Sequence, residues 1–342
     1  MATTTTLREL WDTTRMRLLV EIEREGSVSG AAAAIGIGQP SASQHLRLLE
    51  AAAGQRLVER SGRGSQLTEA GQVLAARAAQ ALSSLTAADE ELDALAGLQT
   101  GTIHLGASTA PGVYLLPDTL GCFRRTYPGV TVDVEVAASE EILKRLLNGR
   151  VQLALVGATS ADDRIQLDPF LEDEVVGVAK PGLAQLKGGK LAPARLAEFM
   201  LLGREPGSSS QRIVDDELRA IGIQPAGVWE LGSSEAIKRA AREGLGVAFL
   251  SRYAVAEEVE RGDLESFRLA GRPPLLRHFS VAHLAGRPLS PAERSFVATL
   301  TSCCAKQADY AAACVGALRT PRAKDLPSVS RGPTTVQRPN GS

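Results

Sequence analysis

One short predicted helix, beginning at Gln39, carries side chains that can read the edges of DNA bases and grip phosphates. Ala42, Leu46 and Leu49 recur at spacings of four and three, so that face of the helix points to a core. The other positions of its first three turns supply hydroxyls, an amide and a guanidinium, which are groups that contact bases and phosphates. The candidate DNA-binding residues on this helix are Gln39, Pro40, Ser41, Ser43, Gln44 and Arg47. A plain helical hairpin with a solvated polar face is the alternative interpretation.

The flanking segments favour DNA binding. The alanine-dense helix before it (residues 31–34) lets a partner helix approach closely, and the glycines at 36 and 38 permit a tight turn. Residues 56–67 have the pattern of a short hairpin, or wing, which can place Arg63 at its tip in the minor groove, with Arg60 nearby. Residues 1–64 hold eight arginines against seven acids, so the attraction for DNA must come from local clustering of arginines.

A second group of polar side chains stands where predicted strands end and helices begin. Ser108 and Thr109 follow one strand, and residues 207–209 follow another, so hydroxyls and free N–H groups at both places favour an anion. Helices beginning at Ser139 and Ser234 add further hydroxyls. The candidate ligand-binding residues from this pattern are Ser108, Thr109, Ser139, Gly207, Ser208, Ser209 and Ser234. Ordinary N-capping also explains each serine singly, and that alternative stays open.

The elements that position the first group are helical. An amphipathic helix over residues 7–24 covers the DNA-binding fold, and a second helix over residues 68–96 follows the hairpin. The apolar positions of the long helix alternate steps of three and four, as in a coiled-coil seam: Ala78, Ala81, Leu85, Ala88, Leu92 and Leu95. A helix of roughly 45 Å with one apolar stripe is not stable alone, so the seam predicts a partner chain. Docking of the stripe within the chain is the alternative.

The elements that position the second group form an α/β domain. Strands and helices alternate over residues 102–156 and again over 199–250, each as a βαβαβ unit with a parallel sheet. The helix from Ser139 aligns with that from Ser234 at a constant offset of 95 residues. Two similar lobes enclose a ligand cleft at the carboxyl ends of their strands. Residues 174–179 and 279–282 are predicted crossover strands, residues 111–126 one helix, and residues 291–302 a final helix.

Composition excludes several classes of protein. The 342 residues have a formal net charge of −1 and no apolar run of membrane-spanning length. The first ten residues lack the basic and then apolar pattern of an export signal, which favours the cytoplasm. Four cysteines show no metal-ligand spacing, so reduced thiols are expected, with a redox switch as the alternative. None of the four histidines stands in a catalytic motif, and His104 within a strand is interpreted as structural.

These motifs and their order resemble the LysR-type transcriptional regulators. The resemblance is carried by residues 26–50, the stretch LVERSGRGSQLTEAG at 57–71, and segments 105–117, 203–212, 230–251, 262–267 and 289–300. It implies a winged helix-turn-helix followed by an effector domain similar to type 2 periplasmic binding proteins. It also implies a homodimer or homotetramer that binds a double-stranded DNA operator and a small, anionic metabolite, with no cofactor, no metal and no membrane.

The expected domains follow this resemblance. They are a winged helix-turn-helix at 1–67, a dimerisation helix at 68–98, an effector domain at 99–305, and a disordered basic tail at 306–342. Within the effector domain, lobe I is expected at about 99–177 and 280–305, and lobe II at about 178–279. The tail is interpreted as a solvated segment, with an extra arm for nucleic acid as the alternative.

In the DNA-binding part, Gly38 stands where the family usually has serine and Gln44 where arginine is frequent, and three positions of the effector domain also depart from the family pattern. Gln211 stands where arginine is usual, so a charge for an anionic ligand is displaced to Arg212 or supplied by Arg204, which joins the candidate set. Ala138 and Gly157 replace polar residues, which predicts a less polar pocket. The alternative function, a solute-binding or enzymatic protein with the same two-lobed fold, is opposed by the missing export signal and the missing nucleophile–base pair.

Overall fold

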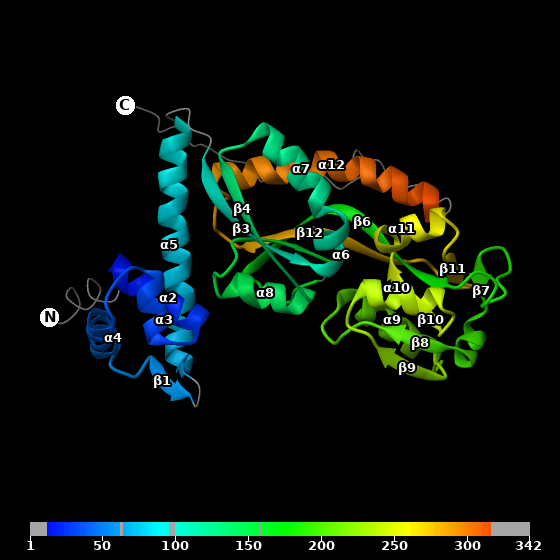
Figure 1. Cartoon of the computed structure of the whole chain (residues 1–342), viewed down its shortest axis with the longest axis horizontal. Coiled ribbons are helices and arrows are strands. Elements are labelled where there is room, and N and C mark those ends of the chain that lie inside the picture. The colour runs from blue at the N-terminus through cyan, green and yellow to red at the C-terminus, as the bar shows by residue number, and fades with distance from the viewer. Residues whose placement is uncertain (1–11, 62–63, 96–99, 158, 316–342) are drawn as a thin grey trace, which may run out of the picture.

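The computed structural model describes residues 12–61, 64–95, 100–157 and 159–315. Figure 1 shows a helical N-terminal region that includes one long helix, followed by a two-lobed α/β region. No helix among the described residues is long and apolar enough to cross a membrane.

The N-terminal region is a winged helix-turn-helix. Its elements are α2 (Thr13–Glu25), α3 (Val28–Ala34), α4 (Gln39–Ala53), β1 (Val58–Ser61), β2 (Gly64–Leu67) and α5 (Glu69–Leu95). Asp12 caps α2 by accepting a hydrogen bond from the backbone N–H of Arg15 at 3.1 Å. Strands β1 and β2 pair in antiparallel fashion, which confirms the predicted hairpin. Leu18, Leu19 and Ile22 of α2 are buried in the core of this region.

Helix α5 begins as predicted. Thr68 accepts a hydrogen bond from the N–H of Gly71 at 3.1 Å, and its own hydroxyl donates to the carbonyl of Arg56 at 2.8 Å. Ala78 is buried, as are Ala75 and Ala79 on the same helix. The exposed part of the predicted seam is therefore Leu85, Ala88 and Leu92, with Ala81 partly buried. The side chain of Leu95 lies outside the described residues.

The effector region has one twisted sheet that runs through both lobes. Its strand order is β4-β3-β5-β12-β6-β10-β8-β9, with β11 paired to β6 and β7. Here lobe I denotes β3, β4, β5, α6, α7, α8 and α12, and lobe II denotes β7 to β10, α9 and α10. The long antiparallel strands β6 and β12 join the lobes, which confirms the two predicted crossovers. The bounds of the strands are β3 (Gly101–Ser108), β4 (Val130–Ala137), β5 (Leu153–Val156), β6 (Ile165–Ala179), β7 (Lys190–Leu191), β8 (Met200–Gly203), β9 (Gly227–Glu230), β10 (Val247–Ser251), β11 (Glu265–Leu269) and β12 (Leu275–Leu284).

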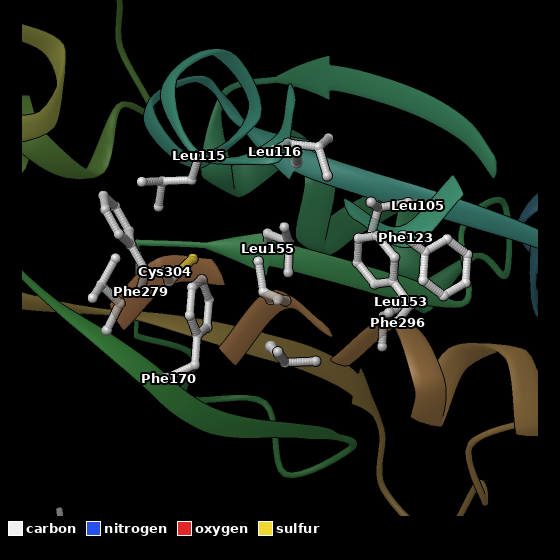
Figure 2. Close-up of a cluster of buried hydrophobic side chains, with 14 of the residues drawn as sticks. Leu105, Leu115, Leu116, Phe123, Leu153, Leu155, Phe170, Phe279, Phe296 and Cys304 are labelled. Atoms are coloured by element: carbon white, nitrogen blue, oxygen red, sulfur yellow. The ribbon is translucent and has the colours of Figure 1, made fainter. Parts of the chain in front are cut away.

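Helices cover this sheet. They are α6 (Thr109–Tyr114), α7 (Leu116–Thr126), α8 (Ser139–Leu147), the 3-10 helix η1 (Pro193–Glu198), α9 (Ser209–Ile221), α10 (Ser234–Arg242), α11 (Arg252–Glu260) and α12 (Pro291–Val315). The core of lobe I lies between the sheet and α7 and α12. Figure 2 shows Phe123, Phe296 and Leu153 packed together within it. Phe123 and Phe296 meet edge to face, with ring centroids 5.3 Å apart.

Two sequence-based predictions about helices were wrong. The single helix expected over 111–126 is two helices that meet at Leu115. Pro117 has no N–H and its ring would clash with an earlier carbonyl, so it fits only at the start of a new helix. Helix α12 runs to Val315, so residues 306–315 are helical and do not belong to a disordered tail. The rest of that tail, residues 316–342, lies outside the described residues.

Candidate functional site

The helix α4 presents the predicted DNA-binding face to solvent. Ala42 and Leu49 are buried, as their spacing requires. Of the candidate residues, Gln39, Pro40, Gln44 and Arg47 are exposed, and Ser41 and Ser43 are partly buried at the flanks of that face. The Nε of Arg47 donates to the carbonyl of Ser43 at 3.2 Å, so the guanidinium lies along the helix.

The wing is fixed to this helix and to the end of α2. Glu50 at the far end of α4 accepts hydrogen bonds from the backbone N–H groups of Leu57 at 3.0 Å and Val58 at 3.4 Å. The N–H of Ser65 donates to the carbonyl of Gly26 at 2.8 Å. Arg60 is exposed on β1, whereas Arg63 lies outside the described residues. The wing is thus held beside α4.

Replacing Gln44 by alanine should relax base preference at one position of each half-site. An exposed glutamine amide can pair with adenine in a bidentate manner, which discriminates by about 1–3 kcal/mol. Binding of the full-length chain to duplexes varied one base pair at a time would measure the loss. The matched change at Arg47, also exposed on α4, should instead weaken all duplexes similarly if it contacts a phosphate. An unchanged preference in the Gln44 variant would rule out this docking of α4.

The effector region brings most of the predicted ligand-binding residues together. A small cavity between the lobes is lined by six of them: Ser108, Thr109, Ser139, Arg204, Ser208 and Ser209. Ser234 does not line this cavity, but its hydroxyl accepts a hydrogen bond from Nη1 of Arg204 at 2.8 Å. Gly207 also stands outside the lining, and its backbone has a φ of +84° beside Glu140. Helices α8 and α9 both begin at this cavity, so their N-terminal N–H groups face it from opposite lobes.

Arg204 is the centre of the hydrogen bonds on the lobe II side. Its guanidinium holds Glu205 with two hydrogen bonds of 2.6 and 2.8 Å. It also crosses the cleft, because Nη2 donates to the hydroxyl of Thr109 at 3.1 Å. Only 6% of the Arg204 surface is exposed, so this charge is held out of solvent between the two lobes.

Arg277 is a second buried arginine in the cavity, and sequence reasoning missed it. Its Nη1 donates to Ser209 at 2.7 Å, and its Nε donates to Asp173 at 2.8 Å. Asp173 also accepts a hydrogen bond from Ser251 at 2.8 Å. Burial raises the pKa of the Asp173 carboxyl, and Arg277 and Ser251 act against that rise. Arg277 lies directly opposite Asp173 on the paired strands β12 and β6. The sequence alone does not give the register of these two strands, so it does not show that the two residues meet.

Two of the three departures in the effector domain, Gln211 and Gly157, have structural explanations. Gln211 accepts a hydrogen bond from the backbone N–H of Arg204 at 2.8 Å, so it positions that arginine. Arg212 is exposed and does not line the cavity. Ala138 does line it. A Cβ on Gly157 would stand 3.0 Å from the ring of Phe279 and 3.1 Å from Nη1 of Arg277, so glycine leaves the space in which Arg277 lies.

The two lobes touch each other around the cavity. The hydroxyls of Ser139 and Ser209 are 3.4 Å apart across it. On one side, the hydroxyl of Tyr114 in lobe I donates to Glu235 in lobe II at 2.9 Å, and Lys238 lies over the Tyr114 ring. The cavity has a volume of about 20 Å³, enough for one water molecule. A larger ligand would extend beyond this cavity or require the lobes to move apart.

No group of three or more histidine, cysteine or acidic side chains suited to a metal ion occurs among the described residues. His104 on β3 pairs with Asp133 at 3.3 Å and lies outside the cleft lining. Cys304 is buried on α12, where burial raises the pKa of its thiol to about 12. Such a thiol is almost wholly protonated at neutral pH and reacts slowly.

Comparison with known sequences agrees with this arrangement. Residues 13–72 match the family described as bacterial regulatory helix-turn-helix protein, lysR family, and residues 96–305 match the LysR substrate binding domain. The chain therefore belongs to the LysR family and is a DNA-binding transcriptional regulator. This confirms the family, the fold class and the regulatory function predicted from the sequence.

Two relatives and one solved structure are similar over most of their length. A probable RuBisCO transcriptional regulator of Porphyra purpurea is 34% identical over 254 residues, 72% of this chain and 80% of the relative. The HTH-type transcriptional activator CmpR of Synechocystis is 31% identical over 283 residues, 83% of this chain and 92% of CmpR. The Synechocystis CcmR regulatory domain in complex with 2-PG superposes with a TM-score of 0.56 at 28% identity, covering 59% of this chain and 97% of that domain.

Proposed function

We propose that this protein regulates transcription as a homo-oligomer that binds operator DNA through α4 and the wing, and that a small anion bound between the lobes switches it. The observation that carries the proposal is the pair of buried arginines, Arg204 and Arg277, at one cavity between two helix N-termini. The protein acts in the cytoplasm, where the chromosomal operator is, and has no catalytic role.

The cleft favours a phosphorylated or carboxylated metabolite. Hydroxyls from both lobes surround the two guanidiniums, and each guanidinium offers several N–H donors that suit phosphate or carboxylate oxygens. Glu205 and Asp173 already pair with these arginines, so the ligand must compete with, or join, these ion pairs. The similarity to a regulatory domain that binds 2-PG supports the same class of ligand here.

The DNA-binding part of the proposal is tested by selection. The purified full-length chain, mixed with a library of randomised duplexes, should enrich a motif with two related half-sites. Half-sites related by a dyad are expected because a two-fold dimer places two α4 helices one or more helical turns apart. A Gln44→Ala, Arg47→Ala variant is the control for duplexes that the protein retains through non-specific electrostatic attraction. Equal enrichment by the variant would contradict recognition through α4.

Thr109→Val should weaken binding of the ligand and leave the operator affinity of the unliganded protein unchanged. The substitution keeps the shape of the side chain and removes the hydroxyl that Arg204 reaches across the cleft. Loss of one hydrogen bond to a charged group costs about 1.5–3 kcal/mol, which is roughly a 10- to 150-fold weaker ligand. Calorimetric titration of full-length protein with 2-phosphoglycolate measures this change.

Two outcomes would contradict the proposed site. Full affinity of the Thr109→Val variant for 2-phosphoglycolate would place the ligand elsewhere. Loss of operator binding by the unliganded variant would show that Thr109 is needed for the fold. Thr126→Val is the matched control, because the hydroxyl of that threonine in lobe I also makes a hydrogen bond but lies at the end of α7, outside the cleft lining.

A further inference from the structure

Helix α8 has one end in the cleft and the other against the DNA-binding region. Its first residue, Ser139, is 2% exposed and lines the cavity between the lobes. The nine residues of α8 span about 13 Å. Figure 1 shows α8 between α5 and lobe II, so the helix bridges the two regions of the chain.

The body of α8 is packed too tightly to move independently of its neighbours. Ile142, Leu143 and Leu146 are buried in a common core with β5 and β12. A Cβ on Gly106 of β3 would stand 2.8 Å from the Ile142 side chain, so no space remains between the helix and that strand. Close-packed interiors are stiff and transmit displacement, so a shift at Ser139 carries the whole helix with it.

The C-terminal end of α8 meets α5 directly. Gly149, which follows the helix, has a φ of +72°, and a Cβ at this position would overlap the Cβ of Ala79 on α5 and stand 3.5 Å from its Cα. Ala79 itself is buried. The backbone at Gly149 is therefore in direct contact with helix α5.

Beside Gly149, Arg150 attracts Glu23 of α2 electrostatically. Glu23 of α2 is partly buried, and burial raises the pKa of its carboxyl, while Arg150 acts against that rise. Arg150 is anchored from the other side, since its Nε donates to Glu135 of β4 at 2.8 Å, and Arg145 of α8 reaches the same carboxylate at 2.7 Å. Next to this contact lies a cavity of about 530 Å³ between α2 and α5 on one side and lobe I on the other. The two regions therefore meet in a tight contact at Gly149 with open space beside it, which suits a pivot.

We propose that α8 couples the ligand cleft to the DNA-binding region of the same chain, with Gly149 and Arg150 as the contact that holds α5 and α2. This inference rests on the proposed function for the ligand in the cleft. An anion at the N-terminus of α8 shifts this helix together with the strands of lobe I against which it packs, and the contact at Ala79 passes that shift to α5. The DNA-binding region then turns about the pivot, which alters its fit to the operator.

The docking contact is tested without any ligand. In full-length protein, Arg150→Glu should raise the amide hydrogen exchange of residues 19–26 about fivefold, because it turns the attraction between Arg150 and Glu23 of α2 into repulsion. The double reversal Glu23→Arg, Arg150→Glu should restore protection. Lys144→Glu is the matched control, because Lys144 lies on α8, six residues before Arg150, with its side chain 64% exposed, and does not line the cavity beside α2. Unchanged exchange at residues 19–26 in the Arg150→Glu variant would overturn the docking contact.

The coupling is tested with 2-phosphoglycolate on the same variants. Arg150→Glu should bind the compound as the wild type does in calorimetry, because Arg150 is outside the cleft lining. Its operator affinity, however, should no longer change when the compound is added, and the double reversal should recover that response. A full response in Arg150→Glu would overturn the inference. Failure of the wild type to bind 2-phosphoglycolate would instead contradict the proposed ligand, and the exchange measurement would still decide the docking contact.

Discussion

A Leu85→Glu, Leu92→Glu variant is expected to be monomeric and to lose operator affinity by about two to four orders of magnitude. Both leucines lie on the outer part of α5, with 51% and 65% of their surface exposed. Exposed leucines one heptad apart form the seam through which two such helices pair. Placing carboxylates at both positions brings like charges together in the seam and removes its apolar surface.

The loss in DNA affinity follows from the loss of the second half-site. A dimer binds its second half-site as an intramolecular event, which strengthens binding by about 10²–10⁴ over one site alone. Light scattering gives the mass, and titration of the selected operator gives the affinity. Leu245→Glu is the matched control, because Leu245 is 48% exposed but lies in lobe II, far along the chain from α5. An unchanged mass in the double variant would show that the seam does not hold the oligomer together.

The helices and strands that line the cleft could be predicted where the local sequence pattern determines the secondary structure. Helix α8 begins at the predicted Ser139. Its apolar positions recur at helical spacing, and Gly149 permits the left-handed turn that follows it. The serines at the starts of α8 and α9 lie in the cleft, since parallel strands and their following helices share one edge of the sheet.

Features that depend on contacts distant in sequence were missed. Helix α11 was not predicted because six of its nine residues are buried, including the charged Arg252 and Glu258, so its sequence shows no clear apolar stripe. The Arg277–Asp173 pair joins residues 104 positions apart and depends on the register of β6 against β12. The internal repeat predicted that Ser234 would contact the ligand. In the structure the Ser234 hydroxyl instead accepts a hydrogen bond from Arg204.

Replacing Arg277 by methionine should destabilise the fold and abolish binding of the anion at the same time. The guanidinium is 8% exposed and pairs with Asp173, which is fully buried. Removing one partner of a buried ion pair leaves an uncompensated charge, which costs about 3–5 kcal/mol. Burial would then raise the pKa of Asp173 without opposition from Arg277. Since burial raises this pKa by penalising the charged carboxylate, the loss of stability should be smallest at low pH. It should grow as the pH rises from the ordinary pKa of an aspartate towards the raised one, and level off above it.

A second variant separates the structural role of Arg277 from its role toward the ligand. In Arg277→Met, Asp173→Asn the buried charge is gone, and the asparagine oxygen can still accept the hydrogen bond from Ser251. Denaturant unfolding should therefore show most of the stability restored and its pH dependence lost. Titration with 2-phosphoglycolate should show no recovery of binding, because the donor that points to Ser209 at the start of α9 remains absent. If the stabilised double variant bound the compound as tightly as the wild type, Arg277 would be a structural residue only, and Arg204 would be left to supply the charge for the anion.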